Sequence, residues 1–237
     1  MASLRITLLL AASSSTHLVF TDPSDSVKAE EKQRFRGGDL LTRIQYLMSL
    51  FLKSILWELT LSESAVLFAL HYPCPTSAQL LYLLMREGSI FMPHLGITPL
   101  FIAGSLMQIF GFLIRRACFR TLGRHFTFAL AMRDDHKLIT NGPYAIVHHP
   151  SYTGGMMVFV GMLFVLSGRN SWWAECGPSD ILASKVLMTV WSATTPAAAS
   201  MLVLRTGKED AVLREEFGSQ WDKWAERTRY RLVPGLY

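Results

Sequence analysis

Long apolar stretches alternate along this chain with short segments that carry most of its charge. Five such stretches are Ile6–Thr21, Ser54–Tyr72, Ser89–Ile114, Ser151–Gly168 and Val186–Leu204. The last three hold no charged residue and are long enough to cross about 30 Å of hydrocarbon as helices. The pattern predicts an all-α fold, a polytopic transmembrane helix bundle of about five spans.

The distribution of Lys and Arg gives the predicted bundle an orientation. Five spans place residues 22–53, 115–150 and 205–237 on one side, and these segments hold 19 of the 23 basic residues. Positive charge favours the cytosolic side of a membrane. We therefore expect an amino terminus in the lumen or outside the cell and a cytosolic carboxyl tail. A cleaved signal peptide at residues 1–21 is the alternative for the first stretch.

Several residues within the predicted spans indicate helix packing. Glu58 and Glu63 lie at membrane depth, where an unpaired carboxylate is costly. We expect both to face the bundle and contact neighbouring helices, with a substrate or proton site as the alternative. Small residues permit close helix approach, and the relevant glycines are Gly104, Gly111, Gly154, Gly155 and Gly161.

Composition narrows the classes of function. Half of the 237 residues are hydrophobic and 17% are charged, where a soluble domain carries nearer a quarter. The pI of about 9.2 comes without a basic stripe interleaved with aromatic residues, so nucleic-acid binding is not predicted. The three cysteines, Cys74, Cys118 and Cys176, lack the spacing of a metal or disulfide framework.

Residues 121–153, TLGRHFTFALAMRDDHKLITNGPYAIVHHPSYT, concentrate the polar and aromatic groups suited to ligand binding. Pro143 and Pro150 fix the backbone around them, which favours a rigid loop at the membrane face. Three histidines, His136, His148 and His149, raise the possibility of a metal. No metal is predicted, because adjacent side chains diverge on an extended backbone and no carboxylate has ligand spacing.

The tail after the last predicted span supplies a second group of candidate residues. Arg205 and Glu209 lie four residues apart, so a continuing helix places both on one face, where they could pair or hold a zwitterionic ligand. Leu213, Phe217, Trp221 and Trp224 recur at spacings of four, four and three. This spacing predicts an amphipathic helix that covers the loop or lies on the bilayer.

These pieces occur in the order LGRHFT, HKLITNGPY, HPSYTGG, RTGKED, FGSQWDKW and RLVPGLY. In that order they resemble the protein-S-isoprenylcysteine O-methyltransferase family, also called isoprenylcysteine carboxyl methyltransferases, over about residues 121–237. The apolar pattern places three amino-terminal spans in residues 1–120, and the resemblance implies a methyltransferase core with two spans, a cofactor loop and a cytosolic tail in residues 121–237. The chain departs from the family pattern at two places. It has His148-His149-Pro150 where the family usually has Arg-His-Pro, and Glu209-Asp210 where the family usually has Glu-Glu.

The resemblance implies S-adenosyl-L-methionine as the cofactor and a prenylated carboxyl-terminal cysteine as the substrate, at the endoplasmic reticulum membrane. Arg205 is implied as the substrate-binding and catalytic residue. The implied cofactor contacts are His136, Lys137, Leu138, Ile139, Tyr144, His149, Pro150, Ser151, Tyr152 and Glu209. A phospholipid N-methyltransferase, a membrane sterol reductase and a catalytically silent membrane scaffold are the alternatives.

Overall fold

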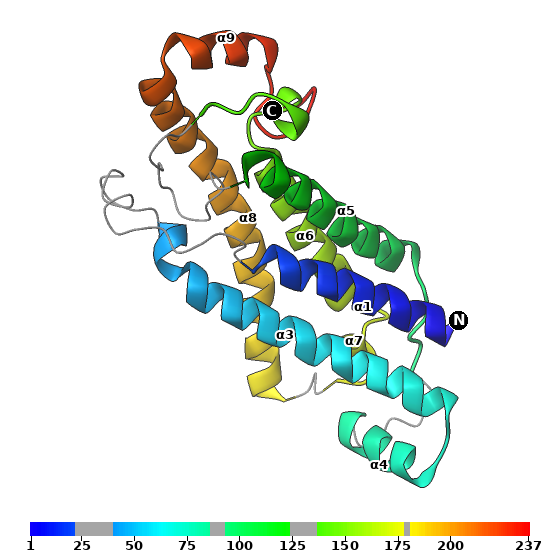
Figure 1. The fold of residues 1–237 in the computed structure, drawn as a ribbon. Coiled ribbons are helices and arrows are strands. Elements are labelled where there is room, and N and C mark those ends of the chain that lie inside the picture. The colour runs from blue at the N-terminus through cyan, green and yellow to red at the C-terminus, as the bar shows by residue number, and fades with distance from the viewer. Residues whose placement is uncertain (22–39, 86–92, 124–136, 178–180) are drawn as a thin grey trace. The chain divides into compact units, whose positions relative to one another are not determined.

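The computed structural model describes residues 1–21, 40–85, 93–123, 137–177 and 181–237, with helices, turns and no strand among them (Figure 1). The side chains of residues 40–46 are not described. The helices are α1 (Ala2–Val19), α3 (Leu40–His71), α4 (Pro75–Leu84), α5 (Pro99–Leu122), α6 (Pro150–Leu166), α7 (Trp172–Glu175), α8 (Leu182–Phe217) and α9 (Ser219–Arg227), with a 3-10 turn, η2, at Gly142–Ala145. The predicted all-α class is confirmed for the described residues.

The third predicted span begins later than the charge pattern indicated. Residues 93–98 are not helical, and α5 starts at Pro99. The Phe101 amide donates to the Thr98 hydroxyl at 3.1 Å, which caps the helix, and proline is favoured at the first helical position. The uncharged run Ser89–Ile114 is therefore not one continuous helix, because the cap at Thr98 sets the start of α5.

The carboxyl-terminal helix also differs from its prediction. Val186–Leu204 lies inside the longer helix α8, which continues through Arg205 and Glu209 to Phe217. Gly218 then adopts a φ of 49°, a left-handed conformation that glycine tolerates, and α9 starts at Ser219. The four apolar residues predicted on one amphipathic helix thus lie on two helices.

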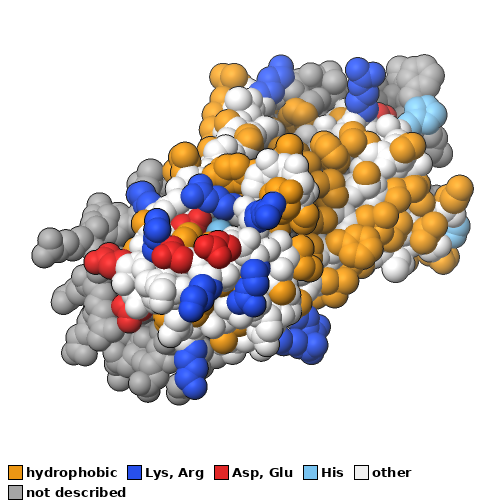
Figure 2. All heavy atoms as spheres, turned by 90° about the horizontal axis from the view of Figure 1, so that it is seen from above, with side chains coloured by type: hydrophobic (Ala, Val, Ile, Leu, Met, Phe, Trp, Pro, Cys, Tyr) orange, Lys and Arg blue, Asp and Glu red, His pale blue; other side chains and the backbone are white. Residues whose placement is uncertain are grey.

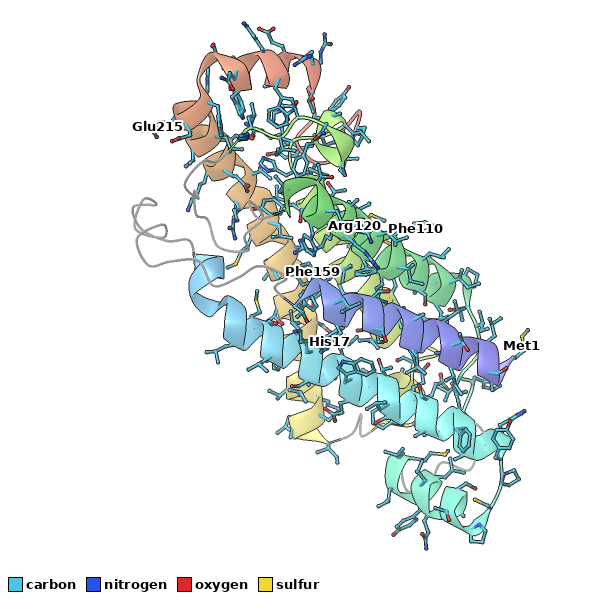
Figure 3. The ribbon with its side chains drawn as sticks, in the orientation of Figure 1. Met1, His17, Phe110, Arg120, Phe159 and Glu215 are labelled. Atoms are coloured by element: carbon cyan, nitrogen blue, oxygen red, sulfur yellow. The ribbon has the colours of Figure 1, made fainter. Side chains whose placement is uncertain are left out.

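Two compact units divide the described chain. One contains Met1–Leu18, Leu50–Ile109 and Val158–Pro196, and the other contains Val19–Ser49, Phe110–Met157 and Ala197–Tyr237. In the first unit, α1 runs beside α3 (Figure 1), and the Trp57 indole donates to the His17 ring at 3.1 Å (His17 is labelled in Figure 3).

Of the two carboxylates predicted to face the bundle, Glu63 is buried in the first unit, where its partner is Arg5. Glu58 is exposed, so the prediction is wrong for that residue. The Arg5 Nε donates to the Glu63 carboxylate at 2.7 Å, and the Trp172 amide donates to the other oxygen of the same carboxylate at 2.8 Å. Backbone carbonyls of Gly96 and Asn170 accept from the remaining Arg5 nitrogens. These contacts support the packing interpretation of Glu63.

Helices α5 and α6 approach closely through glycines in each unit. A Cβ on Gly161 would lie 2.5 Å from the Gly104 carbonyl, and a Cβ on Gly154 would lie 2.6 Å from the Gly111 carbonyl. Neither carbonyl can move as a side chain would. The predicted close packing is therefore confirmed at both crossings.

Two described helices, α5 and α8, are long and apolar enough to cross a membrane, and α6 is a shorter apolar helix. The count of about five spans is not confirmed, because α1 and α3 do not meet the same criterion of length and apolarity.

Candidate functional site

The site lies in the second unit and begins at a turn fixed by glycine and proline. Gly142 has a φ of 60°, and Pro143 follows it in the 3-10 turn η2. Five residues after η2 ends, Pro150 starts helix α6, at a position where the backbone amide has no helical partner to lose. His148 and His149 are therefore held between two prolines at the start of a helix.

The carboxyl-terminal segment lies against this loop and fixes its backbone. The amides of His148 and His149 donate to the carbonyls of Tyr230 and Arg231 at 2.9 and 2.8 Å. The Thr153 hydroxyl donates to the Leu232 carbonyl at 2.6 Å. Helix α9 adds the Trp224 indole, which donates to the Tyr144 carbonyl at 3.0 Å. The tail therefore covers the loop, which is one of the two placements that the amphipathic pattern allowed.

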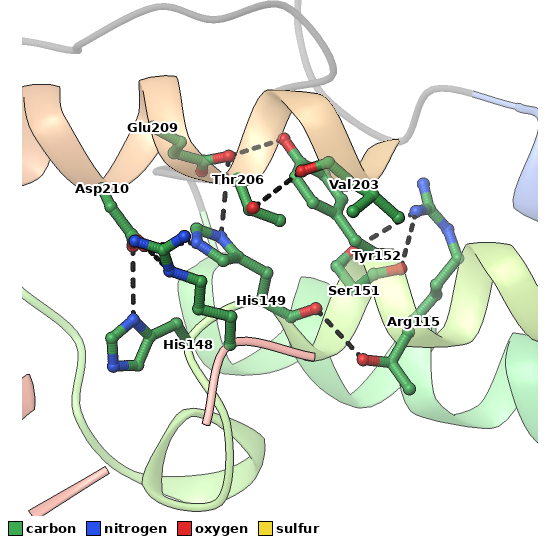
Figure 4. A network of polar contacts seen from close by, with 11 residues as sticks. Arg115, His148, His149, Ser151, Tyr152, Val203, Thr206, Glu209 and Asp210 are labelled. Carbon is green, nitrogen blue, oxygen red and sulfur yellow. Dashed lines mark hydrogen bonds and ion pairs between the residues drawn. The ribbon is translucent and has the colours of Figure 1, made fainter. Parts of the chain in front are cut away.

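Tyr152 connects the loop to the two predicted tail residues. Its hydroxyl donates to the Glu209 carboxylate at 2.5 Å (Figure 4). The guanidinium of Arg205 lies 5.9 Å from the centre of the Tyr152 ring. Because α8 is continuous through both tail residues, they share a face, as their spacing predicted. Arg205 is buried, whereas the Glu209 side chain keeps 32% of its surface exposed.

Asp210, the next residue on α8, gathers a second set of contacts (Figure 4). Its Oδ1 atom lies 2.9 Å from His149 Nε2 and 3.3 Å from His148 Nδ1, and its Oδ2 atom lies 3.0 Å from Arg231 Nε. His148 Nε2 lies 2.6 Å from the Thr228 carbonyl. The expectation that the adjacent histidines diverge is wrong, because the turn into α6 brings both rings to one carboxylate oxygen.

Electrostatics distinguish the carboxylate of Asp210 from an ordinary surface group. Burial alone would raise its pKa, but hydrogen bonds from His148 and His149 and their charge hold that pKa well below the usual range. The carboxylate is thus stabilised in its ionised form. In the turn η2, burial raises the pKa of the Tyr144 hydroxyl well above its usual value, and a hydrogen bond with Cys118 adds to the shift.

The remaining predicted contacts have varied surroundings. Ser151 is buried, and its hydroxyl and carbonyl both lie 3.1 Å from Arg115 Nη1 on α5. Pro150 is buried, Leu138 and Ile139 are half-buried, and Lys137 is exposed. His136 lies outside the described residues. The structure therefore brings Tyr152, His149, Arg205 and Glu209 together, and the cofactor role of every one of these residues stays a prediction.

Basic and acidic side chains mark the surface of the tail. Figure 2 shows Lys and Arg gathered with Asp and Glu over α9 and the end of α8. The exposed basic residues between positions 208 and 229 are Lys208, Arg214, Lys223, Arg227 and Arg229. This surface is suited to water, in contrast to the exposed apolar residues of α5.

Sequence reasoning missed Asp210 and Arg231 as members of the site. The only available signal was Asp210 standing beside Glu209 where the resembling family has a second glutamate. The pairing with Arg231 could not be found from spacing, because 21 residues and a chain reversal separate the two. Trp224 was named as an apolar position, and its stacking on the His148 ring, with centroids 4.6 Å apart, adds to that role.

Over the described residues, the fold and the site define a helical protein in which a carboxyl-terminal helix and tail close over a rigid loop rich in histidine, tyrosine and proline. Comparison with known proteins shows what this chain is similar to. Residues 104–174 match the isoprenylcysteine carboxyl methyltransferase (ICMT) family. The resemblance inferred from the sequence motifs is confirmed. The matched residues include η2 and α6, and they end before Arg205.

Three curated relatives illustrate the degree of similarity. Protein-S-isoprenylcysteine O-methyltransferase B of Arabidopsis thaliana is 32% identical over 126 residues, which are 52% of this chain and 54% of that protein. Protein-S-isoprenylcysteine O-methyltransferase of Homo sapiens is 31% identical over 142 residues, 59% of this chain and 43% of that protein. The Dictyostelium discoideum protein of that name is 36% identical over 78 residues, which are 32% of this chain and 33% of that protein. The chain spans about half the length of the curated relatives it matches or less.

Proposed function

We propose that this protein transfers a methyl group from S-adenosyl-L-methionine to the carboxyl-terminal carboxylate of a prenylated cysteine. The match of residues 104–174 to the isoprenylcysteine carboxyl methyltransferase family carries the proposal. The names of the relatives in Arabidopsis thaliana and Homo sapiens support the same reaction. The loop and tail described above supply a site of suitable chemistry.

The residues present fit a sulfonium cofactor. When bound, S-adenosyl-L-methionine would supply an activated methyl group together with an ammonium and a carboxylate. Glu209 offers a partly exposed carboxylate for a cationic group, and its orientation is fixed by the Tyr152 hydroxyl at 2.5 Å. The Tyr152 ring offers an electron-rich face to a cation. His149 uses both ring nitrogens toward the tail, because Nε2 lies 2.9 Å from Asp210 and Nδ1 lies 3.8 Å from Glu209.

Arg205 is proposed to orient the substrate carboxylate. Its guanidinium is buried beside Tyr152, one helical turn before Glu209. A guanidinium suits a carboxylate because its planar donors match both oxygens. The substrate carboxylate, with a pKa of about 3.5, is ionised at neutral pH, so no general base is needed. A buried site also disfavours the charged reactants relative to the less charged transition state.

Membrane placement completes the proposal. Helices α5 and α8 would cross the bilayer, with α6 between them in sequence, and residues 205–237 would lie on the cytosolic side. A prenyl chain would then enter from the hydrocarbon, while the cofactor would arrive from water. The endoplasmic reticulum is the compartment suggested by the family resemblance.

The test offers labelled S-adenosyl-L-methionine to membranes that contain the protein, with a farnesylated cysteine, with phosphatidylethanolamine or with neither. Base-labile label on the farnesylated cysteine alone is the expected result. Base-stable label on the phospholipid would favour the N-methyltransferase alternative instead. If no acceptor is labelled and calorimetry detects no binding of S-adenosyl-L-methionine, the methyltransferase proposal fails and the silent scaffold is favoured.

A further inference from the structure

The cluster of His148, His149 and Asp210 has a feature that methyl transfer does not use. All three side chains are buried, and one nitrogen or oxygen from each lies within 4.8 Å of the others. Among the described residues this group alone could hold a metal ion through three ligand atoms. We propose that these residues bind one Zn²⁺ ion through His148 Nδ1, His149 Nε2 and Asp210 Oδ1.

The hydrogen-bonding capacity of His148 supports a cation at this point. Its Nε2 atom lies 2.6 Å from the Thr228 carbonyl, which can only accept, so Nε2 donates there. Nδ1 faces the Asp210 carboxylate at 3.3 Å, where a hydrogen bond joins the two groups. A metal ion can take the place of the proton between this nitrogen and this oxygen. A zinc ion satisfies the nitrogen and the oxygen together.

The distances are compatible with tetrahedral zinc. Bonds of about 2.0–2.1 Å place neighbouring ligand atoms about 3.3 Å apart. Asp210 Oδ1 is 3.3 Å from His148 Nδ1 and 2.9 Å from His149 Nε2, so changes of a few tenths of an ångström complete the geometry on that side. Imidazole nitrogen and carboxylate oxygen are both common zinc ligands.

The groups behind the three ligands are those that support a metal site. Ligating histidines commonly donate their second nitrogen to a carbonyl or a carboxylate. His148 does so to the Thr228 carbonyl, and His149 Nδ1 lies 3.8 Å from the Glu209 carboxylate. Arg231 Nε lies 3.0 Å from the second oxygen of Asp210. A bound ion would thus fasten the loop, helix α8 and the carboxyl-terminal segment to one another.

Calorimetric titration of the purified, chelator-treated full chain with ZnCl₂, in detergent and without S-adenosyl-L-methionine, tests the site. One ion per chain is expected for the unaltered protein. His148→Gln and Asp210→Asn, which keep similar size, should each weaken binding at least tenfold. The matched control is His71→Gln, which changes an exposed histidine of α3 and should bind zinc normally. No zinc uptake by the unaltered chain, or equal uptake by all variants, overturns the proposal.

Cobalt supplies a readout that needs no variant. Co²⁺ bound by two imidazoles and a carboxylate in tetrahedral geometry gives visible absorption bands, which ZnCl₂ should abolish by displacement. Their absence in the unaltered chain would equally overturn the site. Because neither measurement involves methyl transfer, a negative result leaves the proposed enzymatic function standing, and a positive result does not depend on it.

Discussion

Replacing Tyr152 by phenylalanine isolates the contact on which the proposed cofactor site depends. Tyr152→Phe keeps the ring that lies beside Arg205 and stacks on His149, with 13° between the ring planes, and removes only the hydroxyl that donates to Glu209 at 2.5 Å. The Glu209 carboxylate would then lose the donor that fixes its orientation. We expect weaker binding of S-adenosyl-L-methionine with little change in the fold.

The size of the effect follows from the nature of the bond and its exposure. A hydrogen bond to a charged group contributes about 1.5–3 kcal/mol. Glu209 keeps 32% of its side-chain surface exposed, so water can replace part of the lost interaction, and the lower end of the range applies. A loss of about 1.4 kcal/mol is tenfold in affinity. Tyr152→Phe should therefore raise the dissociation constant of the cofactor about tenfold, and Glu209→Ala should abolish measurable binding.

Isothermal titration calorimetry with purified protein in detergent measures both changes directly. Tyr230→Phe provides the matched control, because this exposed tyrosine contributes its backbone carbonyl to the loop. The control should bind the cofactor as the unaltered protein does. Unchanged affinity in Tyr152→Phe together with normal binding by Glu209→Ala would refute the assignment of this pocket.

Three further predictions concern substrate, stability and packing. Arg205→Ala should raise the KM for a prenylcysteine substrate at least tenfold while the cofactor dissociation constant stays the same; the reverse pattern would move Arg205 into the cofactor site. Asp210→Asn should lower the free energy of unfolding by about 3 kcal/mol at pH 7. Because the pKa of Asp210 is lowered in the folded state, the stabilisation by its carboxylate is complete above the ordinary carboxyl pKa of about 4 and is lost as pH falls further. Thermal unfolding curves of the unaltered protein and Asp210→Asn should therefore converge in acid. A difference that stays constant with pH would exclude the ionised carboxylate as the cause. Gly154→Ala should lower the free energy of unfolding by about 1–3 kcal/mol, because its new Cβ would meet the Gly111 carbonyl at 2.6 Å. Gly207→Ala on α8 has open space around the new Cβ and should stabilise the helix slightly. Equal effects of the two substitutions would contradict the packing argument.

The sequence predicted those features of the fold that depend on local composition. Ser151–Gly168 corresponds closely to helix α6, and Val186–Leu204 lies within α8. The boundaries that failed depend on short-range detail. The hydroxyl of Thr98 caps α5 after a non-helical segment, and the left-handed Gly218 divides the predicted tail helix. Hydropathy averages over such single residues and cannot locate them.

The site shows a similar division between local and long-range information. The spacing of Arg205 and Glu209 predicted a shared helical face, and both side chains do lie beside Tyr152. The link from Asp210 to Arg231 requires the chain to reverse after α9, and the sequence gives no measure of that path. Long-range pairs of this kind arise from tertiary packing, so the motifs identified the segments of the site without identifying all of its contacts.

The two consecutive carboxylates of α8 explain how one short segment can serve two tasks. An α-helix turns about 100° per residue, so Glu209 and Asp210 point in different directions. Glu209 faces the Tyr152 hydroxyl, whereas Asp210 faces His148 and Arg231. His149 lies between them, with Nδ1 at 3.8 Å from the first carboxylate and Nε2 at 2.9 Å from the second. A change at either carboxylate must therefore alter the environment of this imidazole, and the proposed cofactor and zinc sites should be energetically coupled through His149.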